Sequence, residues 1–74
     1  MFEARRFLEE NFGDIGGLIA RCRAANVEPP NEAAVQKWRQ RNSIPGEWLT
    51  KLVSVLEAER GEAVSLRPYM GASS

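Results

Sequence analysis

The sequence contains no histidine and a single cysteine, Cys22. One thiol cannot form a disulfide within the chain, and one cysteine without histidine does not supply the usual ligands of a structural zinc site. A chain of 74 residues makes one small domain, which buries only a modest share of its surface. Because the chain can form neither an internal disulfide nor a usual zinc site, a partner subunit remains a possible source of stability.

The sequence also lacks a long apolar run and a net charge. No segment approaches the ~20 apolar residues of a membrane-spanning helix, and ten basic residues balance ten acidic ones. The lone thiol and the absence of a secretory signal predict a cytoplasmic protein. Without histidine, and with no serine or cysteine nucleophile beside a base, the sequence indicates no enzyme, no cofactor, no metal site and no small-molecule substrate.

Apolar residues recur at helical spacing in four segments, and no stretch shows the alternation of a strand. Helices are expected from about Glu3 to Phe12, from Asp14 to about Asn26, from Asn31 to about Arg41, and from Pro45 to Gly61. Asp14 and Asn31 are typical N-caps, and Pro29 and Pro30 cannot continue a helix. The predicted class is all-α, a compact domain of four to five helices.

The domain is expected to span residues 1–61, with a turn near 27–30 that separates the second helix from the third. Residues 62–74 include Gly71 and two terminal serines. They are predicted to form a C-terminal tail that is flexible or takes part in dimer contacts.

The third predicted helix has two different faces. Val35 and Trp38 lie on its apolar side, where the large indole can lock the helix to the domain. From Ala33 to Gly46 the chain has three basic residues and no acid, so the opposite side is polar and basic. A solvated helix face would have the same composition. The alternative is that this face reads DNA, since the major groove, about 12 Å wide, admits one helix whose outer side chains reach base edges.

The residues predicted to contact DNA form two groups. The first reaches base edges from the N-terminal end and outer side of the helix: Asn31, Ala33, Gln36, Lys37 and Gln40. Glutamine can pair with adenine through two hydrogen bonds, and lysine can donate to guanine. The second group lies toward the C-terminal end and is suited to phosphate contacts: Arg39, Arg41 and Asn42.

Other conspicuous residues are predicted to have structural roles. Trp38 and Trp48 are expected in the core, and Cys22 is expected to be a small buried apolar residue. Glu9 and Glu10 are interpreted as solvated helix surface, not as an acid–base pair.

Residues 34–41 (AVQKWRQR), followed by residues 43–49 (SIPGEWL), resemble the AVxxW…R…IPxxWL pattern of Cro-like and lambda-repressor-like regulators of phages and prophages. The resemblance covers roughly residues 14–57. It implies a helix-turn-helix bundle in which the segment before the tryptophan is the recognition helix. It also implies a cytoplasmic location, operator binding and, usually, dimerisation. The sequence differs from the family at residues 24–30, a longer and proline-rich link in place of a short turn.

The expected function is therefore sequence-specific binding of double-stranded DNA by a homodimeric transcriptional regulator, in the simplest case a repressor. Two alternatives stay open. A protein-interaction adaptor or anti-repressor could keep the fold without binding DNA, and the zero net charge favours it. An excisionase-like architectural protein would bend DNA in recombination. The acid-free basic stretch favours DNA over the adaptor.

Overall fold

The structure is a computed structural model that describes residues 2–70, and every regular element in this range is helical. In chain order these elements are α1 (Ala4–Phe12), α2 (Ile15–Ala24), α3 (Glu32–Arg41), α4 (Gly46–Arg60) and the short 3-10 helix η1 (Arg67–Tyr69). The predicted all-α class and its four main helices are confirmed. The last part of the predicted tail, residues 71–74, lies outside the described residues.

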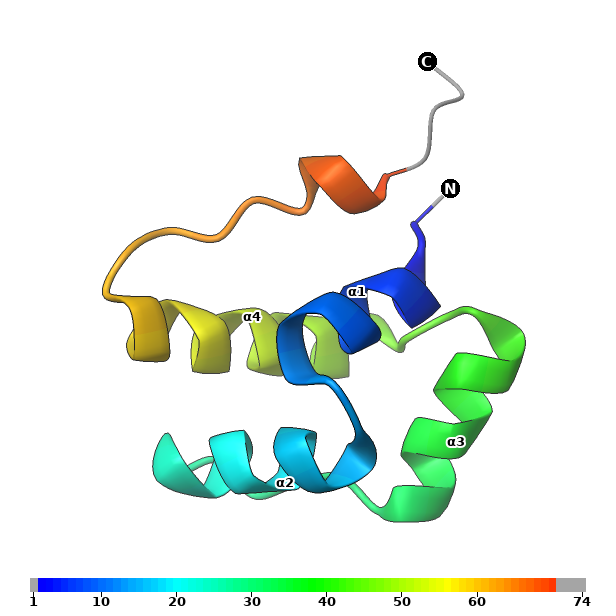
Figure 1. Ribbon diagram of the computed structural model, residues 1–74, viewed down its shortest axis with the longest axis horizontal. Coiled ribbons are helices and arrows are strands. Elements are labelled where there is room, and N and C mark those ends of the chain that lie inside the picture. Colours follow the sequence, from blue (N-terminus) through cyan, green and yellow to red (C-terminus); the bar gives the residue numbers. More distant parts are fainter. Residues whose placement is uncertain (1, 71–74) are drawn as a thin grey trace.

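Helix α1 is the element that joins the others. It packs against α2 and α3, while α2 packs against α4. Figure 1 shows α2 and α4 lying along the same direction, with α3 at one end of this pair and running across it. The shortest extent of the molecule is 20 Å, about two helix diameters. Each main helix therefore has one face in the core and another toward solvent.

The core is built from the apolar stripe of each helix. Phe7 is completely buried, and its ring lies 5.4 Å from that of Tyr69. The same core cluster contains buried side chains from all four main helices: Ala4, Leu8, Phe12, Leu18, Cys22, Val35, Trp38, Leu52, Val55 and Leu56. The predicted burial of Trp38 and Cys22 is confirmed, and burial raises the pKa of the Cys22 thiol. Trp48, predicted in the core, is only partly buried at its edge.

Short polar side chains fix where α2 and α3 begin. The carboxylate of Asp14 accepts a hydrogen bond from the N–H of Gly17 at 2.7 Å, and Asn31 Oδ1 accepts one from the N–H of Ala33 at 2.8 Å. Both predicted N-caps are confirmed, and each satisfies a donor that the helix itself leaves free. Gly17 is also needed for packing, because a Cβ there would collide with the carbonyl oxygen of Phe12.

Two helix ends differ from the prediction. α2 ends at Ala24, earlier than expected, because Asn26 has a φ of 59°. This left-handed conformation is one that asparagine tolerates but that an α-helix cannot include. α4 begins at Gly46, and Pro45, predicted as its first residue, is instead the N-cap with extended backbone.

The connection between α2 and α3, residues 25–31, returns along α2 (Figure 1). The ten residues of α2 span ~15 Å. An extended connection of this length reaches ~23 Å, which is enough to bring the chain back past the helix. Pro30 is buried and holds the connection against the domain. The structure thus has a long link where the sequence indicates a longer, proline-rich connection, and α3 packs mainly on α1.

The segment after α4 returns to the core. Tyr69 is 9% exposed, and its ring meets the edge of Phe7. Its hydroxyl accepts a hydrogen bond from Asn11 Nδ2 and donates one to the Glu10 carboxylate, both at 3.1 Å. The sequence predicts a tail from residue 62 onward that is flexible or takes part in dimer contacts, and it did not indicate this packing within the chain. The expectation missed it because a single tyrosine in a polar segment has no apolar periodicity.

Replacing Trp38 by alanine should unfold or severely loosen the domain. Trp38 is 6% exposed, and its ring centroid lies 5.6 Å from that of Trp48, so truncation opens a cavity beside α3. Truncating a buried aromatic side chain costs ~3–5 kcal/mol, comparable with the whole stability of a small domain. Urea unfolding measures the loss, with the exposed Gln36→Ala on the same helix as control. A variant that melts within a few degrees of the parent would contradict the observed burial.

Replacing Tyr69 by phenylalanine should lower the free energy of unfolding by ~1 kcal/mol, because the ring still packs on Phe7 while the hydroxyl's two hydrogen bonds are lost. The pKa of the Glu10 carboxyl is lowered, first by its hydrogen bond from Arg6 and then by that from Tyr69. A carboxyl with a lowered folded-state pKa stabilises the fold above its unfolded pKa, and this contribution disappears as pH falls through the folded value.

The destabilisation by Tyr69→Phe should therefore shrink in acid, and urea unfolding at neutral and low pH measures it. Tyr69→Ala, which removes the ring as well as the hydroxyl, shows how much stability is lost when the whole contact between η1 and α1 is removed. If parent and Tyr69→Phe unfold alike at neutral pH, the hydroxyl does not tie η1 to α1.

Candidate nucleic-acid interface

Helix α3 exposes one face made of side chains that recur at three- and four-residue spacing. The exposed residues on this outer face are Ala33, Gln36, Lys37 and Gln40, with Arg41 at its edge. On the opposite side Val35 and Trp38 are 2% and 6% exposed. The structure therefore brings the predicted base-contacting residues of the helix onto a single open surface.

One aromatic contact joins the inner side of α3 to α4. The ring centroids of Trp38 and Trp48 are 5.6 Å apart, and the two planes are tilted by 48°. Such aromatic pairs add about 0.5–1.5 kcal/mol beyond the area that they bury. A bulky ring held on one side resists rotation of α3 about its own axis, which keeps the outer face in a defined direction.

Two residues predicted to contact phosphates are bonded to α1. Arg39 Nη2 lies 3.2 Å from Glu9 Oε1, and Asn42 Oδ1 accepts a hydrogen bond from the backbone N–H of Arg5 at 2.8 Å. Asn42 is also the left-handed C-cap of α3, with a φ of 54°. Both side chains therefore help to hold α3 on α1, a role that depends on tertiary contacts and leaves no motif in the sequence.

Asn31 combines a cap with an exposed position. Its Oδ1 is used by the N–H of Ala33, so the side-chain amide nitrogen is the group left for a ligand. Ala33, one residue into the first turn, presents only a methyl group. The N-terminal end of α3 thus offers amide donors and a small apolar surface beside the exposed carboxylate of Glu32.

Ion pairs neutralise part of the basic surface but not the outer face of α3. Among residues 2–70, the ion pairs join Arg6, Arg21 and Arg39 to glutamates. Within the same range neither Lys37 nor Arg41 has a carboxylate within ion-pair distance. The positive charge of this face is therefore compensated only by solvent ions or by a ligand.

Two further cations are connected to α3, one directly and one through Trp48, and the sequence analysis missed both. Arg5 Nε donates to the carbonyl oxygen of Arg39 at 3.0 Å. Lys51 Nζ lies 4.6 Å from the ring centroid of Trp48, the residue that packs on Trp38. Each comes from another helix, so the pattern of α3 could not reveal it. The one available signal is that Lys51 follows Trp48 by three residues, which places them side by side on a helix.

No protein-family model, curated protein or solved structure matches the chain. The resemblance of residues 34–49 to Cro-like regulators therefore stays a hypothesis that rests on those residues. Within the described range no helix is long and apolar enough to cross a bilayer. Nor do three or more Cys, Asp or Glu side chains in that range converge where a metal ion could be held.

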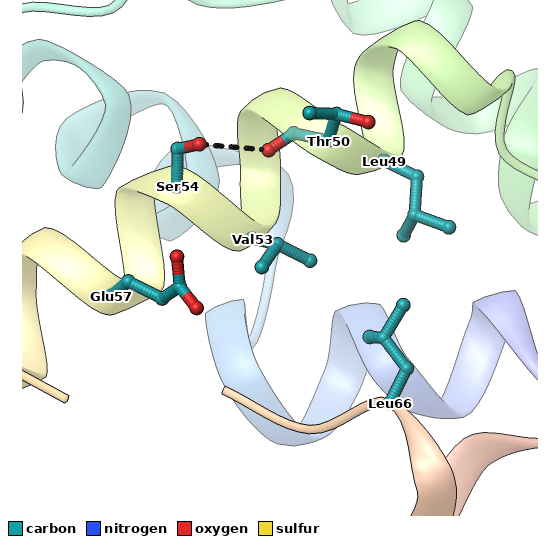
Figure 2. A pocket seen from close by; sticks show the side chains of 6 residues that line it. All are labelled: Leu49, Thr50, Val53, Ser54, Glu57 and Leu66. Carbon is teal, nitrogen blue, oxygen red and sulfur yellow. Dashed lines mark hydrogen bonds between the residues drawn. The ribbon is translucent and has the colours of Figure 1, made fainter. Parts of the chain in front are cut away.

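A groove of about 300 Å³ lies between α4 and the segment that follows it, and is lined by Leu49, Thr50, Val53, Ser54, Glu57 and Leu66. Figure 2 shows Leu49 and Val53 on α4 facing Leu66, and the Ser54 hydroxyl bonded to the carbonyl of Thr50. The carboxylate of Glu57 accepts the N–H of Val64 at 3.0 Å. Since these polar groups are already bonded within the chain, the groove presents apolar surface and no assembled catalytic chemistry.

Exchanging the charges of Glu9 and Arg39 separates a positioning role for Arg39 from direct contact with DNA. Each single reversal should destabilise the fold by up to ~1 kcal/mol, because the pair is partly exposed and becomes a like-charge pair. The double variant Glu9→Arg/Arg39→Glu should restore both stability and duplex affinity. Urea unfolding and duplex titration measure the two properties. Restored stability with lost affinity would instead assign Arg39 to a phosphate.

Proposed function

We propose that this protein binds double-stranded DNA sequence-specifically, as a phage- or prophage-type transcriptional regulator that inserts α3 into the major groove. The observation that carries the proposal is an exposed, un-neutralised basic face on a helix whose opposite face is locked into the core. A groove about 12 Å wide accepts one helix with its side chains. The resemblance of residues 34–49 to Cro-like regulators supports the same function.

Base readout is assigned to the centre of the outer face. Gln36 and Gln40 each offer a donor and an acceptor, which match the two hydrogen-bonding groups of adenine in the major groove. Lys37 offers donors for the acceptors of guanine. Arg41, at the edge of the face, is assigned to the phosphate backbone, whose contacts position the protein without specifying sequence.

Two copies are proposed to bind one operator. A helix of ten residues contacts few base pairs, and a second subunit doubles the contacts. The operator is then an inverted repeat with half-sites about 34 Å apart, one turn of the duplex. The subunit contacts are expected on α4 and the segment after it, where Leu49, Val53 and Leu66 leave apolar surface in the groove of Figure 2.

The adaptor or anti-repressor remains the second candidate, because the net charge of the chain is zero. The two functions differ in one measurable property. A DNA-binding protein releases counterions from the duplex, so its affinity falls steeply as salt rises, whereas an adaptor has no duplex binding to titrate. An excisionase-like role would share the salt dependence and add a measurable bend of the DNA.

Selection from random duplexes, followed by titration at several salt concentrations, tests the proposal. The parent should select an inverted repeat. Gln36→Ala should relax the preference at one or two base positions, by about 1–3 kcal/mol of discrimination. Arg41→Ala should weaken binding to all sequences alike and reduce the salt slope by about one. Arg23→Ala is the matched control, because Arg23 lies in the last turn of α2, at the end far from α3 (Figure 1).

The possible results point to different conclusions. Absence of duplex binding at low salt would favour the adaptor. Binding of one copy to an asymmetric site would remove the dimer but keep the DNA function. If Arg41→Ala changes the selected DNA sequence and Gln36→Ala does not, base readout belongs to Arg41 and the phosphate contact to Gln36.

A further inference from the structure

Arg5 and Lys51 are both held in place beside α3 by contacts that leave their positive charge intact. Arg5 Nε is bonded to the carbonyl oxygen of Arg39 at 3.0 Å, and Lys51 Nζ lies 4.6 Å above the Trp48 ring. Arg21 shows the alternative arrangement, since it is held by a glutamate at 2.8 Å that cancels its charge. A cation that is fixed and un-neutralised is suited to bind an anion from outside the protein.

Lys51 has an acidic residue one turn earlier on the same helix, Glu47, and this spacing favours an ion pair. No such pair forms, and the ammonium lies over Trp48 instead. A ring face attracts a cation by about 0.5–1 kcal/mol at exposed sites without supplying a counter-charge. The N–H donors of Lys51 therefore remain available to a negatively charged oxygen.

Arg5 is positioned by the C-terminal end of α3. A helix C-terminus carries unpaired carbonyl groups and a partial negative charge, which favours a guanidinium beside it. Nε uses one of the five N–H groups of the side chain, and Arg5 is exposed. Its other donors point to no carboxylate within ion-pair distance in residues 2–70.

The two cations approach α3 from different helices. Trp38 and Arg39 follow Val35 by three and four residues, so they lie on either side of it around the helix. Lys51 is connected to α3 through Trp48, which packs on Trp38, and Arg5 is bonded to the backbone at the C-terminal end of α3. Helix α3 thus has one fixed cation from α4 behind its tryptophan contact and one from α1 at its C-terminal end.

We propose that Arg5 and Lys51 bind phosphates of the two DNA strands that border the groove occupied by α3. This inference rests on the proposed DNA-binding function. A helix in the major groove lies between two phosphate backbones, so fixed cations that approach it from two different helices are suited to contact them. Because both side chains are already held in place, they lose less conformational freedom on binding than mobile side chains would.

Titration of a random-sequence duplex at several salt concentrations tests the proposal. Arg5→Gln and Lys51→Gln should each reduce the salt slope by about one, and the double variant by about two. Arg5→Lys and Lys51→Arg, which keep the charge, should retain most of the slope. Arg23→Gln, which removes an equal charge at the end of α2 far from α3, should not change it. Lys51→Met and Arg5→Met keep the apolar stems and serve as second neutral variants.

Each outcome separates this inference from the function on which it rests. If the parent binds the duplex and the neutral variants have the same salt slope as the parent, Arg5 and Lys51 do not bind phosphates. The proposed function of α3 would remain. The same holds if the variants alter the selected base sequence at unchanged slope, because they would then act by moving α3. A parent that binds no duplex at low salt would overturn both. Thermal melts of every variant confirm that the proteins compared are folded.

Discussion

The contact between the rings of Trp38 and Trp48 is the interaction on which the geometry of α3 depends. This helix contributes only two buried side chains, Val35 and Trp38, to the core. Val35 is too small to prevent rotation, so the indole decides which residues of α3 face solvent. Truncating a buried aromatic costs ~3–5 kcal/mol, several times the value of one hydrogen bond. The direction of the outer face is therefore set mainly by apolar packing.

Polar contacts with α1 act at a different place on the same helix. Trp38 holds the middle of α3, while the bonds from Arg5 to Asn42 Oδ1 and to the Arg39 carbonyl hold its C-terminal end. Each hydrogen bond contributes about 0.5–1.5 kcal/mol, too little to keep the helix in place alone. A helix pinned at its middle can still tilt, and bonds at one end remove that freedom. Packing and hydrogen bonding thus constrain different motions.

The sequence predicted correctly the features that depend on residues close together in the chain. The helices follow from apolar periodicity, and Asp14 and Asn31 cap them through residues two or three positions away. It did not predict features that depend on residues far apart in the chain, such as the packing of Tyr69, whose hydroxyl is bonded to α1. The placement of Gln36 and Lys37 on one exposed face could be predicted from helical spacing. The bonding of Arg39 to Glu9 could not, because nothing within α3 indicates which helix lies beside it.

The zero net charge of the chain is weak evidence against a DNA-binding surface, because salt limits the distance over which charges act. At physiological ionic strength the Debye length is about 8 Å. The 15 residues of α4 span ~22 Å, so Glu57 and Glu59 lie about two Debye lengths from its first turn. Glu32 and Glu47 are closer, but they occupy the first turns of α3 and α4, where they offset the positive ends of the helix dipoles. A duplex against α3 would therefore respond to the local excess of basic side chains. The distant acids would act mainly by weakening attachment of DNA to the other faces, which favours binding through one surface over general coating.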